Sequence, residues 1–548
     1  MNTELRLNVP SMLPANFSRL LQTPSSSAVE QLYNLYLYDE KLLTEANNIL
    51  GGSKYNSSIN YLIRSSLSDN NAQTMGSISG SDIELATKLL HQTYWDRAIG
   101  LTDVKHHMPM DRKIEWQENV KKLNFPEFNL ENVISTLTTL LLDRDKFVAE
   151  RVDGIFKKLS GDHVTNSPSG FYKRMIINHI HSGERHYYSI NSTVCGYVND
   201  LRITIARFME RSTADTENSI STYSTIQRII NSNLFGVWNN VDGGALRVKV
   251  FKKGTIHIEV HPDIAWQLNE ILAILYPMAI PSEFRAKPKS IPKEFVLSQN
   301  VLDVAVISAM EGVELAYDRS DDNNINYRTY KRKVNVYTPK YSYSMDKHVL
   351  QKVAKVLKSI GGVELPRHEF EFDYDITDVL NEICITGCVP DHVSHQFYET
   401  PDAVAQEMAS MVGQLSGSRI LEPSAGQGSI AQYLKGDVTC VEVSKLHCKI
   451  LESKGFKVIN QDFINWGDNQ PMQFDAIVMN PPFSQGRATI HFETALNMLD
   501  RGGVLVGLAT QSTVRKLMKT HNVTTHRDLD SNEFGGVSVD LTIFKIIV

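Results

Sequence analysis

Apolar positions recur along the first half of the chain with a helical period. They return every three to four residues, the spacing that places them on one face of an α-helix. This pattern predicts helices at residues 29–50, 83–101, 129–160, 171–180, 197–211 and 262–276. The helix at 129–160 has the clearest pattern, and Asn129 is in position to cap its first turn.

A small sheet interrupts this helical pattern. Residues 246–251 and 256–260 alternate apolar and polar side chains around a Lys-Lys-Gly-Thr turn, which predicts a β-hairpin. Residues 51–82 are rich in Ser, Asn and Gly, so we expect a long loop there. The pattern therefore predicts a flexible arm at 1–28 and one mainly helical domain with a small hairpin at 29–277.

The pattern changes after a proline-rich connector. A connector and a small α+β region are expected at residues 278–391. From there on, short apolar runs alternate with helical stretches, and the predicted strands are residues 419–422, 438–443, 456–460, 474–480, 503–509 and 541–548. Alternating strands and helices are typical of a parallel sheet covered by helices on both faces. We therefore expect a separate α/β domain at 392–548 and a multi-domain α/β protein.

Composition limits the class of protein. The chain has 548 residues, too many for one ordinary core, with 42% hydrophobic and 22% charged residues and a net charge of −6. Its five cysteines suit reduced thiols in a cytoplasmic compartment. No stretch resembles a signal peptide or a membrane span, so we expect no membrane partner.

Positive charge is concentrated in one segment. Residues 327–358 contain nine Lys or Arg and one acidic residue, Asp346, with five tyrosines interleaved. This mixture suits phosphate contacts and base stacking. A solvated basic face, balanced by the acidic residues of 364–382, is an equally good interpretation. The candidate nucleic-acid contacts are Arg328, Lys331, Arg332, Lys333, Tyr337 and Lys340. Residues 171–174 form a weaker candidate.

The strand predicted at 474–480 ends in Asn480-Pro481-Pro482-Phe483. Two prolines remove two backbone donors and stiffen the turn. The corner therefore presents bare carbonyls, an amide and an aromatic ring. Acceptors beside a stacking plate suit a planar substrate that carries an amino group.

Acidic side chains follow three other predicted strands. Glu422 precedes a loop with glycines at 426 and 428, Glu442 ends the next strand, and Asp462-Phe463 follows the third. Carboxyl ends of parallel strands meet at one edge of a sheet, where ligands bind. A carboxylate there can accept ribose hydroxyls, and Asp462 can accept an adenine amino group. Each acid alone could be an ordinary solvated residue, but together they predict a nucleoside-binding edge.

The order of these motifs, with Phe397-Tyr-Glu-Thr400-Pro401 before them, resembles class I S-adenosylmethionine-dependent methyltransferases, and more narrowly the DNA methyltransferases that act on adenine N6. The resemblance implies a Rossmann-like fold with a mostly parallel seven-stranded sheet. It implies that Asn480 and the Pro481 carbonyl bind the target amino group, with Pro482 shaping the corner and Phe483 stacking on the base. The cofactor residues that it implies are Phe397, Thr400, Glu422, Pro423, Ser424, Ala425, Gly426, Gly428, Glu442, Asp462 and Phe463.

The resemblance also implies double-stranded DNA as the partner, with the target base flipped out of the helix. RNA or protein-glutamine methyltransferases have near-identical corners, so they remain alternatives, as does a non-catalytic DNA-binding or antirestriction protein. Only 65 residues follow Phe483, which leaves no room for a C-terminal recognition domain. Target recognition is therefore expected either to come from the N-terminal half or to be lax. That half resembles an uncharacterised domain family fused to methyltransferases of phages and mobile elements, which suggests protection from restriction in a bacterial or phage-infected cell.

One group of residues has zinc-binding types. Cys384, Cys388, His392 and His395 occur within twelve residues. Their spacing is not that of a standard zinc knuckle, and Gly387 and Pro390 prevent a single helix. Ordinary residues of a domain junction are the favoured interpretation, and no metal is expected.

Overall fold

The structure is a computed structural model of the chain. It describes residues 25–51, 83–155, 170–171, 174–184, 187–211, 220–278, 280–289, 295–298, 300–319, 330–340, 342–389, 398–413, 418–468, 474–483, 486–530, 533 and 540–548. Most of the arm expected at 1–28 and nearly all of the loop expected at 51–82 lie outside these residues. None of the described helices combines the length and the apolar character that a membrane crossing requires.

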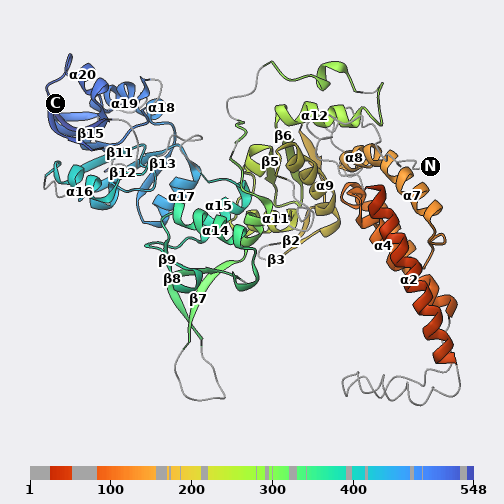
Figure 1. Ribbon diagram of the computed structural model, residues 1–548. Coiled ribbons are helices and arrows are strands. Elements are labelled where there is room, and N and C mark those ends of the chain that lie inside the picture. Colours follow the sequence, from red (N-terminus) through yellow and green to blue (C-terminus); the bar gives the residue numbers. More distant parts are fainter. Residues whose placement is uncertain are drawn as a thin grey trace. The chain divides into compact units, whose positions relative to one another are not determined.

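The chain divides into two compact units. The first comprises residues 1–224 and 248–294, and the second comprises residues 225–247 and 295–548. In the described part, the helices that lie in the first unit are α2 (Ser26–Gly51), α4 (Ile83–Gly100), α5 (Val104–His107), α6 (Met110–Lys121), α7 (Leu130–Leu142), α8 (Arg144–Asp153), α9 (Ser192–Phe208) and α12 (Pro262–Leu272). Its strands include β1 (Met175–Ile177), β2 (His181–Glu184), β3 (Tyr187–Ile190), most of β5 (Leu246–Val250) and β6 (Ile256–Val260). The expected hairpin is β5 and β6 (Figure 1).

Two predicted helices of the first unit are wrong. The helix expected at 129–160 is capped by Asn129, whose side chain accepts a hydrogen bond from the backbone of Asn132, but α7 ends at Leu142 and α8 starts at Arg144. The buried apolar spacing continues through the break at Asp143, so the period does not reveal it. The helix expected at 171–180 contains strand β1, because a short apolar run has no decisive period.

A network of buried charges lies among α5, α8 and α9. Arg144 donates from Nη1 to Asp103 Oδ1 over 3.2 Å, and His107 Nε2 lies 3.2 Å from Asp103 Oδ2. Arg207 Nη1 lies 2.9 Å from His107 Nδ1, and Arg151 Nε donates to Asp200 Oδ1 over 2.9 Å. Burial lowers the pKa of His107 to about 4. His107 is therefore neutral at pH 7 and links a carboxylate to a guanidinium.

The second unit begins with a small α+β region. In the described part its elements are β4 (Asn239–Val241), α13 (Val304–Glu311), β7 (Val313–Arg319), β8 (Tyr330–Pro339), α14 (Lys347–Ser359), β9 (Val363–Leu365), β10 (Glu369–Glu371) and α15 (Thr377–Thr386), with α11 (Thr222–Asn231) crossing the boundary of the unit. Strands β7, β8, β10 and β9 form an antiparallel sheet in that order. Its core contains Val353, Leu357 and Phe370.

The rest of the second unit is the expected α/β fold. Its strands are β11 (Arg419–Pro423), β12 (Asp437–Glu442), β13 (Lys457–Asn460), β14 (Phe474–Met479), β15 (Leu499–Thr510), β16 (Val523–Leu529) and β17 (Leu541–Ile547). They form one seven-stranded sheet in the order β13-β12-β11-β14-β15-β17-β16, in which the pairs of β17 are antiparallel and the other pairs parallel. This confirms the predicted mostly parallel, Rossmann-like sheet. The pattern did not predict β16.

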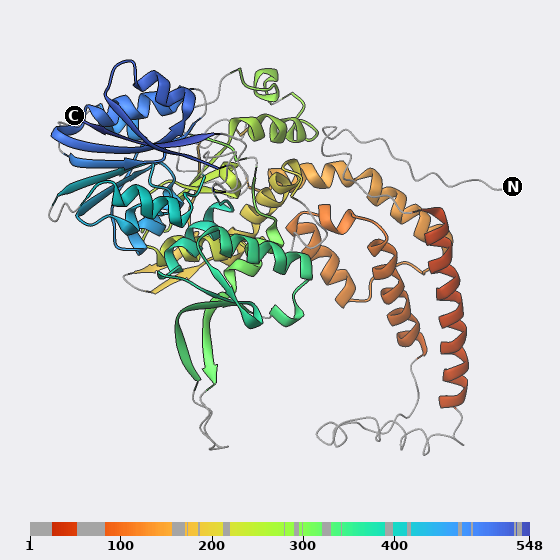
Figure 2. The same ribbon diagram turned by 60° about the vertical axis from the view of Figure 1, so that its left-hand side comes forward.

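Two apolar cores cover the two faces of this sheet (Figures 1 and 2). One core includes residues of α16 (Asp402–Ser410) and α17 (Lys445–Ser453), and the other includes residues of α18 (Phe463–Gly467), α19 (Arg487–Leu496) and α20 (Gln511–Leu517). Helix α17 also contributes Leu446 and Ile450 to the core of the small α+β region. The small region and the seven-stranded sheet are therefore joined by continuous apolar packing.

Candidate active site

The Asn-Pro-Pro-Phe corner lies directly after β14, near the middle of the sheet. The Asn480 side chain donates from Nδ2 to Thr400 Oγ1 over 3.1 Å and to the Tyr398 carbonyl over 3.4 Å. A carbonyl can only accept, so this contact orients the amide with its nitrogen toward Tyr398. Asn480 Oδ1 is buried and has no hydrogen-bond partner within the part of the chain that the structure describes. The corner thus holds one oriented acceptor, Asn480 Oδ1, that is able to accept a hydrogen bond from a ligand.

The other corner residues provide a rigid apolar wall. Pro481 is buried, and Pro482 and Phe483 are partly exposed. The Phe483 ring packs against both cores of the sheet. Because its ring is supported from both sides, Phe483 is held in place while part of its surface remains accessible.

The loop after β11 adopts a backbone that approaches its neighbours closely. Ser424, Gly426 and Gly428 have positive φ angles of 58°, 55° and 83°. A Cβ at Gly428 would lie 2.8 Å from Leu451 Cδ2, so glycine is needed there for space as well as for conformation. Pro423 and Ala425 are buried in the same turn. The loop therefore has a fixed, tight path along the end of the sheet.

Two carboxylates at this edge are buried. Glu422 is 3% exposed, and burial is the main reason that its pKa lies well above the usual range. Glu422 Oε2 has no hydrogen-bond partner among the residues that are described. Burial also raises the pKa of Glu442, although its Oε2 and Oε1 accept hydrogen bonds of 2.8 Å from the backbones of Gly426 and Ser444. Each oxygen of Glu442 keeps a second lone pair for a ligand hydroxyl.

Asp462 and Phe463 lie at the start of α18. Asp462 Oδ1 accepts a hydrogen bond from the Asn465 backbone, and Oδ2 forms an ion pair with Arg487 Nη2 at 2.8 Å. The Phe463 ring is buried, and its centroid lies 5.4 Å from that of His491. The acid is therefore at the expected edge, but it already has a cationic partner.

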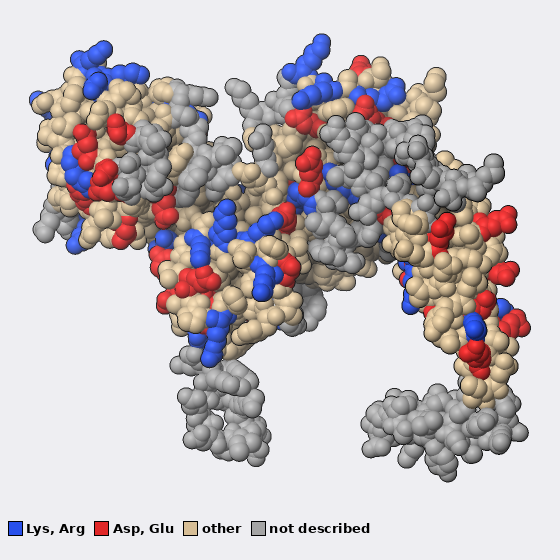
Figure 3. Space-filling view, in the orientation of Figure 1, with Lys and Arg blue, Asp and Glu red and all other residues tan. Residues whose placement is uncertain are grey.

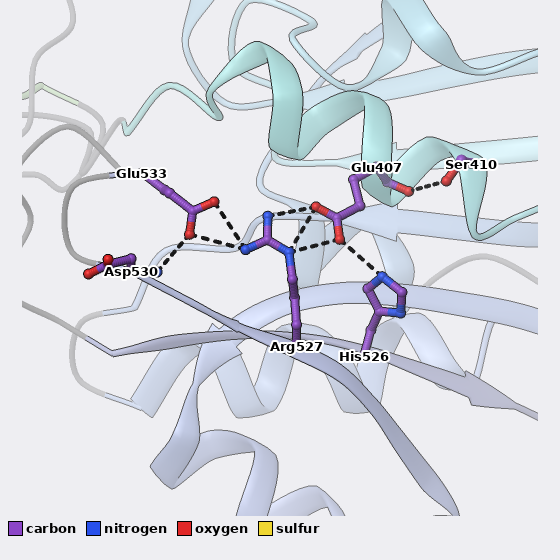
Figure 4. A network of polar contacts seen from close by, with 6 residues as sticks. All are labelled: Glu407, Ser410, His526, Arg527, Asp530 and Glu533. Atoms are coloured by element: carbon purple, nitrogen blue, oxygen red, sulfur yellow. Dashed lines mark hydrogen bonds and ion pairs between the residues drawn. The ribbon is translucent and has the colours of Figure 1, made fainter.

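Thr400 reaches the corner from the segment that leads into α16. It is buried, and its hydroxyl accepts the hydrogen bond from Asn480. Helix α16 is tied to β16 by the network in Figure 4, in which Arg527 Nη2 lies 2.7 Å from Glu407 Oε2 and Arg527 Nη1 lies 3.1 Å from Glu533 Oε1. His526 Nε2 is 3.0 Å from Glu407 Oε1. These contacts fix the helix whose start supports Asn480. Phe397 lies outside the described residues.

Three residues of this edge were missed by the sequence reasoning. Gln427, between the two loop glycines, donates from Nε2 to the Ser359 carbonyl of α14 over 2.7 Å. Arg487 pairs with Asp462, and His491 Nδ1 lies 3.5 Å from Ser424 Oγ. His491 is buried, its Nε2 has no partner, and burial lowers its pKa to about 4. These contacts join segments that lie far apart in the sequence, so no local spacing of residues predicts them.

The basic segment is less uniform than its sequence. Tyr337 is 4% exposed and donates its hydroxyl to Asp375 over 2.9 Å, so its ring is not available for stacking on a base, contrary to expectation. Lys333 pairs with Glu369 at 2.7 Å, and the Arg332 guanidinium lies 5.9 Å from the centroid of the Tyr317 ring. Lys331 lies on β8, Lys340 is exposed directly after it, and Arg328 lies outside the described residues.

Of the four residues with zinc-binding types, the structure describes the two cysteines. Cys384 is buried in α15, Cys388 is partly exposed, and burial raises the pKa of Cys384 to about 12. His392 and His395 are outside the described residues. Among the residues that are described, no cluster of three or more His, Cys, Asp or Glu could hold a metal ion.

Comparison with known families assigns two parts of the chain. Residues 418–532 match the model described as "Methyltransferase small domain", and residues 87–278 match a "Domain of unknown function (DUF4942)". No match was found among curated proteins.

Several solved structures are similar to the chain. TrmN from Thermus thermophilus is 17% identical over 26% of this chain and 48% of its own, with a TM-score of 0.23. The 23S rRNA methyltransferase ErmE is 17% identical over 28% of this chain and 69% of its own, with a TM-score of 0.24. A dimethyladenosine transferase from Plasmodium falciparum is 16% identical over 28% and 62%, with a TM-score of 0.24. The chain thus spans about half the length of TrmN.

The C-terminal region matches a methyltransferase domain family. The family match covers the strands from β11 to β16, and the site described above lies within it, apart from Thr400. The acids at the ends of β11 and β12, the acid after β13 and the corner after β14 lie at the carboxyl edge of these parallel strands, where open α/β sheets bind ligands.

Proposed function

We propose that this protein transfers a methyl group from S-adenosylmethionine to the N6 amino group of adenine in DNA. The observation that carries the proposal is Asn480, whose Oδ1 is a buried, oriented acceptor with no hydrogen-bond donor among the described residues. Leaving such an atom unsatisfied costs about 1–3 kcal/mol. A substrate amino group that donates to Oδ1 recovers this energy, so the corner favours a substrate that carries a hydrogen-bond donor over one that does not.

The residues of the sheet edge fit S-adenosylmethionine. Glu442 would accept the ribose hydroxyls through the spare lone pair on each oxygen, and Asp462 would accept the adenine amino group beside its ion pair with Arg487. Glu422 Oε2 is a buried carboxylate oxygen without a partner, which suits a ligand that carries positive charge. When bound, the cofactor supplies an electrophilic methyl group on a positively charged sulfur.

The corner can activate a weak nucleophile. The lone pair of adenine N6 is delocalised into the ring. When Asn480 Oδ1 and the Pro481 carbonyl accept its two hydrogens, the nitrogen becomes more tetrahedral and its lone pair becomes available. The chemistry then depends on alignment and on preorganised acceptors more than on a strong base. Phe483 provides a supported ring on which the base can stack.

An adenine inside a duplex cannot reach such a corner. The proposal therefore requires that the target base leave the helix, at a cost of a few kcal/mol that stacking on Phe483 partly offsets. The DNA phosphates must be held by other parts of the chain.

Methyl transfer by the purified full-length chain tests this proposal. The protein is incubated with methyl-labelled S-adenosylmethionine and, in separate reactions, duplex DNA, single-stranded DNA, RNA or a protein mixture. Labelled N6-methyladenine in DNA, identified by mass spectrometry of nucleosides, is the expected result. Label that enters only RNA or only glutamine would assign the corner to another substrate and overturn the choice of DNA.

A further inference from the structure

Four lysines lie on one face of helix α14. Lys347, Lys352, Lys355 and Lys358 are all exposed, while Val353, Val356 and Leu357 form the buried face. At 100° per residue the lysines fall within an arc of about 140°. The helix contains no Asp or Glu between Lys347 and Ser359. Figure 3 shows Lys and Arg side chains gathered in the region of this helix.

Two of these lysines are available for a partner. Lys352 pairs with Asp303, and Lys358 pairs with Glu364 at 2.6 Å. Neither Lys347 nor Lys355 has an ion-pair partner in the part of the chain that the structure describes. Tyr343 lies four residues before the helix in the sequence, and it is 86% exposed. Because so much of the ring is exposed, it makes little apolar contact within the protein. A nucleic-acid base or sugar can therefore pack against it.

We propose that the lysine face of α14, with Tyr343, binds the phosphate backbone of the DNA substrate. The choice of DNA rests on the proposed function, whereas the preference for a polyanion rests on the helix itself. From Lys347 to Lys358 the face extends about 16 Å, at 1.5 Å per residue. A nucleic acid offers several phosphates over this length, and each neutralised phosphate releases counterions. The candidate nucleic-acid surface is therefore helix α14 and not strand β8, because on β8 Tyr337 is buried and Lys333 is paired.

The same helix is attached to the cofactor loop. Ser359, the last residue of α14, accepts the hydrogen bond from Gln427, which is buried between the two loop glycines. Lys454, which follows α17, pairs with Asp373 of the small region at 3.2 Å, and Lys445 pairs with Glu382 of α15 at 3.0 Å. The helix that holds phosphate is thereby fixed to the loop that holds the methyl donor. Such an attachment places the bound nucleic acid within reach of the catalytic edge.

Salt-dependent DNA binding, measured without cofactor, tests this inference. A fluorescent duplex is titrated with the full-length protein at several salt concentrations, and the slope of log affinity against log salt is compared among variants. Lys347→Gln with Lys355→Gln should lower the magnitude of the slope by about 2, or about 1 for each lost phosphate contact. Tyr343→Ala should weaken binding with little change in the slope, because it removes stacking and no charge.

A matched control uses two lysines on other elements of the same unit. Lys457, at the start of β13, and Lys519, after α20, are also exposed. Lys457→Gln with Lys519→Gln changes the net charge equally and should leave the slope as it is. Equal slopes for the α14 variant and the wild type would overturn the inference, as would the same loss in the control. Lysine-dependent binding that favours an RNA hairpin over the duplex would overturn the choice of DNA.

The assay also separates this inference from the proposed function. Binding is measured without methyl transfer, so an α14 face that does not bind DNA can be recognised in an enzyme that still methylates it. Conversely, a chain that binds DNA through α14 but methylates nothing would contradict the function and leave the surface intact.

Discussion

Buried carboxylates have opposite surroundings in the two units. In the first unit, Asp103 is contacted by Arg144 and His107, and Asp200 by Arg151. At the edge of the seven-stranded sheet, Glu422 has no basic side chain in ion-pair range among the described residues, and Glu442 has only His447, at 3.9 Å. The free-energy cost of burying a carboxylate is thus offset by cations in the first unit. At the edge of the seven-stranded sheet this cost is left largely uncompensated.

This difference separates structure from function. A buried carboxylate with cationic partners stabilises the arrangement of the helices that supply them, and breaking it is costly. A buried carboxylate without them lowers the stability of the free protein and is useful only when a ligand provides the missing partner. Substitutions in the first group should therefore destabilise the fold and leave cofactor binding intact, and substitutions in the second should weaken cofactor binding without destabilising the free protein.

The largest effect is expected from Asp103→Ala. Removing this carboxylate takes away the acceptor of Arg144 Nη1 and the partner of His107 Nε2, which should cost about 3–5 kcal/mol. The opening free energy of α8 and α9, measured by hydrogen exchange and mass spectrometry, should fall by that amount. Asp96→Ala removes an exposed partner of Lys105 and should cost less than about 1 kcal/mol. Equal losses in the two variants would remove the distinction between buried and exposed pairs.

Asn480→Ala should have the next largest effect, and on activity alone. Loss of one well-placed polar group that contacts the reacting atoms typically costs about 10²–10³-fold in rate. Methyl transfer should fall by that factor, while calorimetry should show cofactor affinity within about twofold of wild type. Asn497→Ala, at the exposed end of α19, is the matched control. Unchanged transfer by Asn480→Ala would exclude the corner as the site of chemistry.

The sequence predicted the positions of the site better than its contacts. Strand ends are marked locally, by an apolar run followed by an acid or by prolines, so Glu422, Glu442, Asp462 and Asn480 were all placed at the correct edge. The partners of these residues come from distant segments, as when Arg487 pairs with Asp462. No local spacing encodes such an approach.

The errors in the fold have the same origin. The break between α7 and α8 is invisible to the apolar period because buried positions continue on both sides of Asp143. Strand β16, with its mostly polar sequence Val523-Thr-Thr-His-Arg-Asp-Leu529, is an edge strand recognised only by its pairing with β17. Tyr337 looked like a surface aromatic among lysines, but its ring packs against Phe372 in the core of the small region.

Glu442→Gln should weaken the binding of S-adenosylmethionine by about tenfold. The substitution keeps the shape of the side chain but removes the charge, and hydrogen bonds to charged groups contribute about 1.5–3 kcal/mol. Calorimetric titration measures the affinity, and the opening free energy of the first unit should not change. Glu452→Gln, on the exposed side of the same helix α17 that follows Glu442, is the control. Equal affinities for wild type and Glu442→Gln would show that this acid does not contact the cofactor.

Glu422→Gln should produce the smallest effect and the one of opposite sign, a gain in stability. Burial raises the pKa of Glu422 in the folded chain. Between its unfolded pKa, near 4.5, and its folded pKa, the unfolded state releases the proton while the folded state retains it. Stability is therefore fully present below the unfolded pKa and is lost as pH rises through the folded pKa. Glutamine carries no charge at any pH, so the variant should avoid this loss.

Thermal unfolding of the cofactor-free protein from pH 4 to pH 8 measures this difference. The curves of wild type and Glu422→Gln should converge at the acid end and separate as pH rises, with the variant more stable by about 1 kcal/mol, the usual gain when an active-site charge is removed. Because Glu442 is present in both proteins, its own raised pKa cancels in the comparison. Added S-adenosylmethionine should stabilise wild type more than the variant. The difference in stability between the two proteins should therefore narrow or change sign. A variant that is less stable at pH 8 would mean that Glu422 has a cationic partner in the folded chain, and the contrast with Asp103 would no longer hold.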